Sequence, residues 1–147
     1  MSAAEVEGWF FLDANILVYC FDEVDPRKRD IADQSVQQAL GTRRGVISYQ
    51  VTQEFLATAL RRFAAPFSAT QAREYLLTVL TPLCQHWPSA AFYDRAMEIL
   101  AETGYHWYDA LIVTAALDTG CTTLLTEDLQ HGRIVRGLTI LNPFVRS

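Results

Sequence analysis

The chain has 147 residues and a formal net charge of −5; half of its residues are hydrophobic and a fifth are charged. This composition excludes a disordered chain, and the length fits one domain, residues 1–147, with a single core. The negative charge excludes a general attraction to nucleic acid, so a polyanionic partner would need a local basic patch or metal ions.

The cysteines and the first residues indicate a cytoplasmic protein. Cys20, Cys84 and Cys121 are odd in number and widely spaced, which is typical of free thiols in a reducing compartment. The opening MSAAEVEG lacks the basic segment and apolar stretch of a secretory signal. Because the sequence contains no apolar run of 18 residues, we expect no transmembrane helix.

Short apolar runs alternate with longer amphipathic segments along the chain. In order, we expect a strand at 9–12, helices at 15–21 and 26–40, a strand at 45–49, helices at 51–63 and 69–80, a strand at 83–87, helices at 90–104 and 107–120, and strands at 121–126 and 137–144. N-cap residues mark four helix starts, namely Asp25 before Pro26, Ser48, Ser68 and Ser89, and glycines mark the ends, namely Gly41, Gly104 and Gly120. This order predicts an α/β fold with a mostly parallel central sheet of four or five strands, flanked by helices.

Four carboxylates occupy similar places relative to these strands. Asp13 ends the first strand, Glu54 lies early in the helix after the second, Asp109 lies near the start of helix 107–120, and Asp128 follows strand 121–126. Because ligands bind beyond the carboxyl ends of the strands in an open parallel sheet, we expect the four carboxylates to converge on one pocket.

Convergent carboxylates repel one another and raise each other's pKa. A divalent cation relieves that repulsion, and Mg²⁺ or Mn²⁺ fits best because both prefer hard oxygen ligands. Such an ion also neutralises phosphate charge and acidifies a coordinated water, which suits phosphodiester hydrolysis. Zinc is disfavoured because none of the three histidines pairs with another at ligand spacing.

Each acid taken alone also has a structural interpretation. Asp13 could form a turn at the end of a strand, Glu54 could lie on a solvated helix flank, and Asp128 could be a loop residue. Asp109 could simply cap a helix, although its apolar neighbours indicate partial burial, which makes an unpaired carboxylate costly. The functional interpretation therefore depends on the four residues together.

The sequence resembles the PIN-domain ribonucleases, in particular the toxin component of VapBC-type toxin–antitoxin pairs. The matching segments are FFLDANILVY (10–19), ISYQVTQEF (47–55), WYDALIVTAAL (107–117) and LLTEDLQHG (124–132), followed by a last strand that ends in NPF. The resemblance spans residues 9–144, and it depends on the ordered set because each motif alone is weak.

The resemblance implies an endoribonuclease that depends on Mg²⁺ or Mn²⁺. Asp13, Glu54, Asp109 and Asp128 carry over as the acidic ligand set, with Asn15 and Thr126 as polar groups that orient the acids. Asp13 and Asp109 would hold the metal most directly, Asp128 would contribute directly or through a water, and Glu54 would act through a water. The implied products carry a 5′-phosphate and a 3′-hydroxyl. Glu127 could be mistaken for the ligand, but Asp128 fits the pattern better.

RNA binding needs positive charge outside the acidic pocket. The basic candidates are Arg27, Lys28, Arg29, Arg43, Arg44, Arg61, Arg62, Arg133 and Arg136, and we favour Arg133 and Arg136 because they closely follow Asp128. The resemblance also implies a homodimer and a small cognate antitoxin that covers the groove. Helix segment 75–80, Phe63 and Phe67 offer apolar surface for such contacts, with core packing as the default interpretation.

Two other functions remain open from the sequence. A catalytically silent PIN-like module would bind RNA or protein without cleaving it, although all four acids are present. A phosphatase or phosphotransfer domain of similar architecture would need a second Asp two residues after Asp13 and a lysine near the site. Asn15 occupies that position, and Lys28, the only lysine, lies in another region, so this second function is disfavoured.

Overall fold

The computed structural model describes residues 6–146 and shows the expected α/β fold. Its sheet has six strands, rather than the four or five expected, in the order β3-β2-β1-β4-β6-β5. Every neighbouring pair is parallel except β5 and β6. The strands are β1 (Phe10–Leu12), β2 (Gly45–Ser48), β3 (Cys84–His86), β4 (Thr123–Leu125), β5 (Ile134–Val135) and β6 (Leu138–Leu141).

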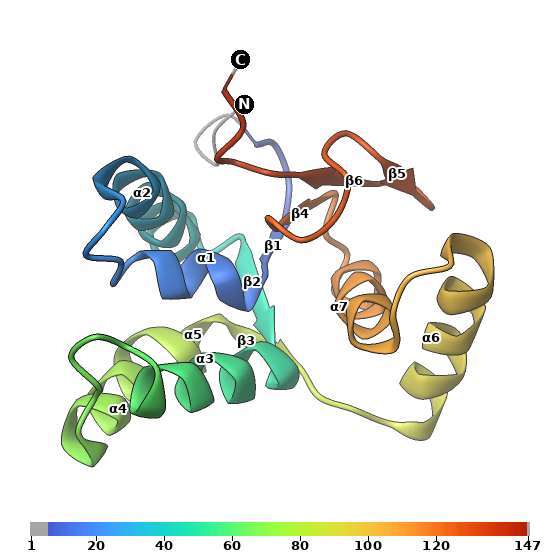
Figure 1. The fold of residues 1–147 in the computed structure, drawn as a ribbon. Coiled ribbons are helices and arrows are strands. Elements are labelled where there is room, and N and C mark those ends of the chain that lie inside the picture. The colour runs from blue at the N-terminus through green and yellow to red at the C-terminus, as the bar shows by residue number, and fades with distance from the viewer. Residues whose placement is uncertain (1–5, 147) are drawn as a thin grey trace.

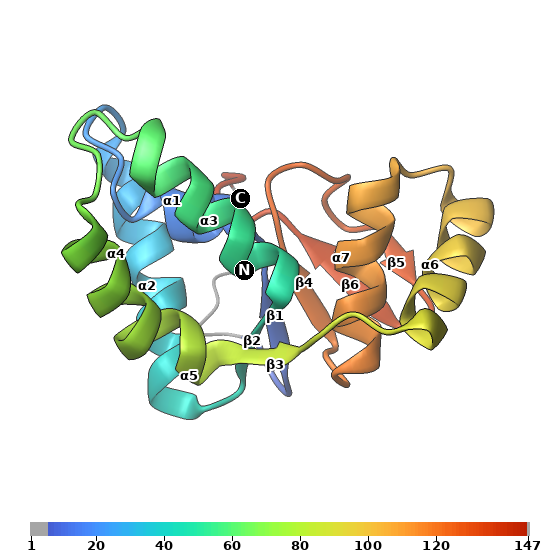
Figure 2. The ribbon, with the colours of Figure 1, turned by 90° about the horizontal axis from the view of Figure 1, so that it is seen from below.

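Helices cover both faces of the sheet (Figures 1 and 2). One side carries α1 (Ala14–Tyr19), α2 (Pro26–Thr42), α3 (Tyr49–Arg61), α4 (Ala69–Tyr75), the π-helix η2 (Leu76–Leu80) and the short α5 (Thr81–Leu83). The other side carries α6 (Ala90–Thr103) and α7 (Trp107–Asp118). No helix within residues 6–146 is long and apolar enough to cross a membrane.

The four predicted N-caps are confirmed, since the side chains of Asp25, Ser48, Ser68 and Ser89 each accept a hydrogen bond from a first-turn backbone N–H. Ser68 and Gln71 form a reciprocal capping box. The predicted stop at Gly41 is wrong. Helix α2 continues to Thr42 and ends at Arg43, which adopts the left-handed conformation with φ of 59°.

Other local predictions also differ from the structure. The expected helix 69–80 widens into the π-helix η2 before it reaches α5, and β5 was not expected at all. Strand β5 has two residues, and its Ile134 is largely exposed, so it leaves no clear hydrophobic pattern. Strands β3, β4 and β6 are shorter than the expected 83–87, 121–126 and 137–144.

The core centres on β1, whose three residues are completely buried between β2 and β4. A second apolar region is a cluster of stacked and edge-on rings from α1, α3 and the following segments, namely Phe21, Phe55, Phe63, Phe67 and Tyr75. Phe63 and Phe67 therefore pack against this protein's own core, which favours the default interpretation over a partner-binding surface.

A matched glycine pair tests the contact between β2 and α2. A Cβ on Gly45 would lie 2.1 Å from Cβ and 2.6 Å from Cα of Ala39, whereas Gly41 has open space around it. We expect Gly45→Ala to lower the free energy of unfolding by about 2–3 kcal/mol through overpacking. Gly41→Ala should leave it unchanged or raise it by up to ~1 kcal/mol through helix propensity. Urea denaturation measures the free energy of unfolding of both variants. An equal change in Gly45→Ala and Gly41→Ala would contradict the close packing of Gly45 against Ala39.

Candidate active site

The sequence-predicted acids lie at the carboxyl edge of the sheet, on both sides of its topological switch point. From β1, the chain proceeds to β2 and β3 on one side and later returns as β4 on the other side. Asp13 directly follows β1, and Thr126 directly follows β4. Because β1 and β4 are neighbouring parallel strands, these two side chains meet although 113 positions separate them.

Hydrogen bonds at the backbone and at both side-chain oxygens fix Asp13. Its backbone N–H donates to the Leu125 carbonyl at 3.0 Å, which extends the pairing of β1 with β4. Its Oδ1 accepts from the Ala14 backbone N–H at 2.7 Å, so Asp13 caps α1, and its Oδ2 accepts from the Thr126 hydroxyl at 2.8 Å. The apolar flanks noted in the sequence therefore bury this carboxylate, and only 6% of Asp13 is exposed.

The pKa of Asp13 is raised to about 7, chiefly by burial and to a smaller extent by the nearby carboxylates of Glu54 and Asp128. The hydrogen bonds from Thr126 and Ala14 oppose this rise. No basic side chain within residues 6–146 forms an ion pair with Asp13. The carboxylate is thus held where its negative charge is costly, which is the condition that a bound cation relieves.

Asn15 and Thr126 connect Asp13 to Asp128. The Asn15 amide donates from Nδ2 to Asp128 Oδ2 at 3.1 Å, and its Oδ1 accepts from the Glu127 backbone N–H at 3.4 Å. The Thr126 hydroxyl donates to Asp13 and accepts from the Asp128 backbone N–H at 3.1 Å. Both residues therefore hydrogen-bond to acids of the predicted set.

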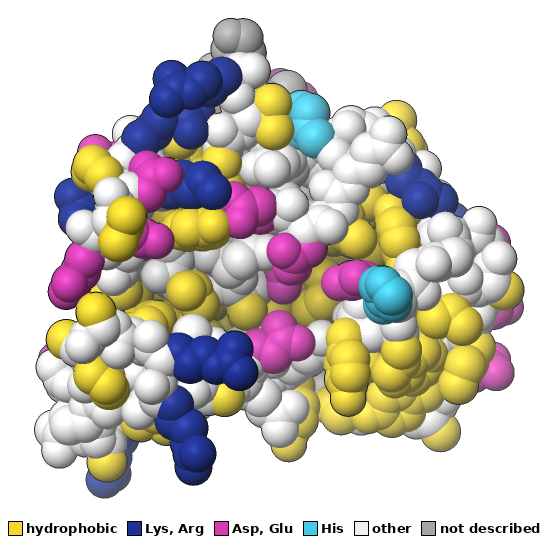
Figure 3. Space-filling view, in the orientation of Figure 1, with side chains coloured by type: hydrophobic (Ala, Val, Ile, Leu, Met, Phe, Trp, Pro, Cys, Tyr) yellow, Lys and Arg dark blue, Asp and Glu magenta, His cyan; other side chains and the backbone are white. Residues whose placement is uncertain are grey.

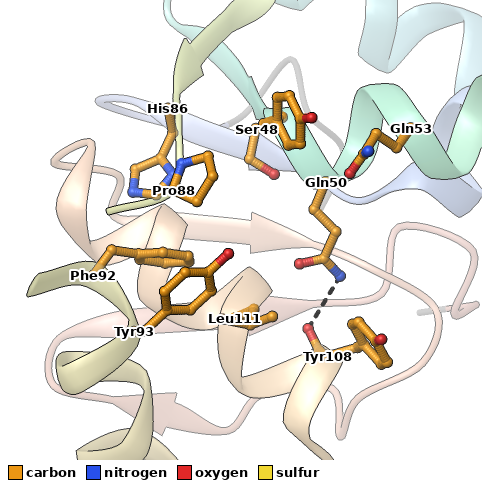
Figure 4. Close-up of a pocket in the computed structure, with 10 residues that line it drawn as sticks. Ser48, Gln50, Gln53, His86, Pro88, Phe92, Tyr93, Tyr108 and Leu111 are labelled. Carbon is orange, nitrogen blue, oxygen red and sulfur yellow. Dashed lines mark hydrogen bonds between the residues drawn. The ribbon is translucent and has the colours of Figure 1, made fainter. Parts of the chain in front are cut away.

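Glu54 reaches the site from α3, where Gln50 supports it. Gln50 Nε2 donates to Glu54 Oε1 at 2.8 Å and contacts the Tyr108 carbonyl at 3.3 Å, so it links α3 to the start of α7. Gln50 also lines a neighbouring pocket, walled by Phe92, Tyr93 and Tyr108 among others (Figure 4). The sequence interpretation missed Gln50, although its spacing of four residues from Glu54 on a helix was a visible signal.

Asp109 lies in the first turn of α7 and is only partly exposed. Burial raises its pKa, the Asp128 carboxylate adds to this effect, and His106 opposes it. Asp109 is not among the residues that line the groove shared by Asp13, Glu54 and Asp128. The structure therefore brings three of the predicted acids to one groove and places the fourth within electrostatic range of Asp128.

The groove is an open cavity of about 530 Å³ between α1, α3 and the loop after β4. Figure 3 shows acidic side chains gathered around the hollow at the centre of this face, with basic side chains beside them. Arg61 and Arg62 supply the basic lining of the groove. Arg133 and Arg136, which the sequence favoured for RNA binding, do not line the groove. Arg133 covers the Tyr105 ring, and Arg136 pairs with Glu102 and Glu98 on α6.

The acids fit a hard divalent cation that keeps most of its water ligands. Within residues 6–146, no three His, Cys, Asp or Glu side chains are grouped closely enough to hold one ion among them. Mg²⁺ commonly binds through one or two carboxylates and retains several waters, so Asp13 with one neighbouring acid suffices as a protein ligand set. The all-oxygen donors exclude a closed zinc site built from thiolates and imidazoles here.

A family model described as PIN domain matches residues 10–137. The chain belongs to the PIN domain family. The match covers the four acids of the predicted site together with Asn15 and Thr126, and it ends just before β6. No curated protein sequence matches the chain.

Solved structures of toxin–antitoxin proteins share this PIN fold. A toxin–antitoxin complex from Klebsiella pneumoniae has 17% identity and a TM-score of 0.63, and the alignment covers 91% of this chain and 97% of that chain. FitAcB from Neisseria gonorrhoeae has 16% identity and a TM-score of 0.60, with coverage of 92% and 98%. VapC20 of Mycobacterium tuberculosis, a sarcin–ricin loop cleaving toxin, has 18% identity and a TM-score of 0.56, with coverage of 81% and 91%. At these identities the likeness shows the fold alone.

The raised pKa of Asp13 predicts a pH dependence of stability for this PIN domain without metal. Between the unfolded pKa near 3.9 and the folded pKa of about 7, the native state binds more protons than the unfolded state. Stability therefore falls as the pH rises through this window, by on the order of 2–4 kcal/mol relative to Asp13→Asn.

Urea denaturation at pH 4–8 in EDTA measures this difference, with Asp13→Asn as the reference. Mn²⁺ should flatten the wild-type profile because it stabilises the ionised carboxylate. A wild-type profile in EDTA that runs parallel to that of Asp13→Asn would contradict the costly burial of this charge.

Proposed function

We propose that this protein is an Mg²⁺- or Mn²⁺-dependent endoribonuclease and the toxin of a toxin–antitoxin pair. The observation that carries the proposal is the buried, unpaired Asp13 carboxylate, which faces the same groove as Glu54 and Asp128. Membership of the PIN family supports a nuclease, and the shared fold with toxin–antitoxin proteins supports the biological role.

In this proposal, Asp13 and Asp128 would hold the ion directly, whereas Asp109 and Glu54 would act through its water ligands. When bound, the ion supplies positive charge against the phosphate and makes water a better nucleophile. Hydrolysis adds the water oxygen to phosphorus and breaks the bond to the 3′ oxygen, which takes up a proton. The products are then a 5′-phosphate and a 3′-hydroxyl.

The protein's own residues supply order around that chemistry. Thr126 and the Ala14 backbone N–H fix both oxygens of Asp13, and Asn15 fixes Asp128. Gln50 positions Glu54 from its own helix. Preorganised groups of this kind need no rearrangement when charge develops during the reaction.

The partners follow from the surface around the groove. A cognate antitoxin would cover the acidic groove with a basic segment, since the groove carries three carboxylates. A second copy of the chain would use the exposed aromatic side chains of Tyr49, Tyr93 and Tyr108, which border the pocket beside the groove.

We place the protein in the cytoplasm, in keeping with its three free cysteines.

RNA cleavage with and without metal tests the enzymatic proposal. Wild-type protein should cleave single-stranded RNA in Mg²⁺ or Mn²⁺ and lose this activity in EDTA. Asp13→Asn and Asp109→Asn should each reduce the rate by about 100-fold or more, because each removes a charge on which metal binding depends.

Asp30→Asn is the matched control, since Asp30 lies on α2, is well exposed and forms an ion pair with its neighbour Arg29 rather than with any residue of the groove. It should cleave at the wild-type rate. Full activity of Asp13→Asn would overturn the site assignment. RNA binding without cleavage by the wild-type protein would favour the silent module, and turnover of a small phosphomonoester alone would favour a phosphatase.

The basic lining of the groove gives a second prediction. Arg61→Gln and Arg62→Gln should each weaken RNA binding and lower the slope of log K against log salt by ~0.7–1, since each removes one phosphate contact. Arg136→Gln should change the slope less, because Arg136 is already paired with Glu102. Fluorescence anisotropy in EDTA, across a salt series, measures all three. A larger change of the salt slope in Arg136→Gln than in Arg61→Gln and Arg62→Gln would place the RNA along β5 instead.

A further inference from the structure

The residue beside Asp128 has an unusually complete set of contacts that the proposed reaction does not use. Both oxygens of Glu127 are engaged, since the Tyr19 hydroxyl donates to Oε1 at 2.5 Å and the Lys28 ammonium donates to Oε2 at 2.6 Å. Lys28 also donates to the Tyr19 hydroxyl at 3.2 Å, which closes the three side chains into a ring of hydrogen bonds.

Aromatic rings enclose this group. The Lys28 ammonium lies 4.7 Å from the ring centroid of Tyr19 and 5.4 Å from that of Phe144, and these two rings pack edge to face at 4.9 Å. The side chains of Lys28 and Glu127 are only 27% and 28% exposed. A salt bridge that is partly buried, hydrogen-bonded and covered by rings is held more firmly than a solvated surface pair.

The three residues come from separate parts of the fold. Tyr19 ends α1, Lys28 lies in the first turn of α2, and Glu127 belongs to the loop after β4. Asn15 on α1 contacts the same loop at the Glu127 backbone N–H and the Asp128 carboxylate. The loop is therefore attached to α1 and α2 at Glu127 and to the groove at Asp128.

We propose that Lys28, Tyr19 and Glu127 form a clamp that positions the 126–128 loop, so that Asp128 faces the groove while Glu127 is kept out of it. The inference rests on the proposed metal-dependent function. Without the clamp, two adjacent carboxylates could reach the same ion, and Asp128 would lose its fixed geometry. Lys28 and Glu127 are positioning residues in this account because neither lines the groove.

The metal dependence of cleavage tests the clamp. Lys28→Met should raise the Mn²⁺ concentration for half-maximal cleavage by about 10- to 100-fold, as is typical when a group that orients a metal ligand is lost. Lys28→Arg should recover most of the wild-type value because it restores the charge. The double variant Lys28→Met/Glu127→Gln should also recover part of it, since the misplaced carboxylate is gone.

Arg29→Met is the matched control for the loss of one positive charge from α2. Its guanidinium contacts the Asp22 carbonyl and not Glu127, so it should leave the Mn²⁺ dependence unchanged. An equal shift in Arg29→Met and Lys28→Met would assign the effect to attraction of RNA and overturn the clamp. An unchanged Mn²⁺ dependence in Lys28→Met would overturn it as well.

A measurement without RNA separates the clamp from the proposed function. Lys28 is the only lysine, so protein with ¹⁵N-labelled lysine gives one side-chain ammonium signal. The contacts with Glu127 and Tyr19 raise the pKa of Lys28, and the signal should be protected from exchange in the wild type and lost in Glu127→Gln. Mn²⁺ should raise the melting temperature of the wild type more than that of Lys28→Met.

If the ammonium signal and the melting temperatures behave as expected while the wild type fails to cleave RNA, the clamp stands and the nuclease proposal falls. If the wild type cleaves RNA but Glu127→Gln leaves the ammonium signal protected, the clamp falls and the nuclease proposal stands.

Discussion

The structure depends on one electrostatic constraint, which is the burial of Asp13 without a basic partner at the edge between β1 and β4. A carboxylate in this position opposes folding unless it is protonated or a cation binds beside it. The fold tolerates this cost because Thr126 and Ala14 satisfy both carboxylate oxygens. In the proposed function, this acid is held ready for a metal ion at the expense of stability when the ion is absent.

The parallel sheet makes this arrangement possible. Neighbouring strands β2, β1 and β4 end at one edge, so residues that follow them meet without long loops. Helix α7 adds Asp109 from the other face, and Gln50 connects that helix to Glu54. The site is thus assembled from rigid elements, whereas its loop, residues 126–128, is secured by side chains from α1 and α2.

Most of the fold, and the three acids that meet at the groove, could be predicted from local signals. The run FFL before Asp13 and the caps at Ser48 and Ser89 identify their elements because the causes lie within a few residues. The end of α2 at Arg43 could not be predicted, since Gly41 was the better local signal. Contacts such as Lys28 with Glu127 join residues 99 positions apart and depend on packing that no local pattern encodes.

The central claim is that a divalent ion binds at Asp13. Anomalous diffraction from Mn²⁺-soaked crystals of the wild type and of Asp13→Asn tests this most directly. We expect an anomalous peak beside the Asp13 carboxylate in the wild type and no peak there in Asp13→Asn. A wild-type map without a peak at Asp13, or a peak that persists in Asp13→Asn, would contradict it.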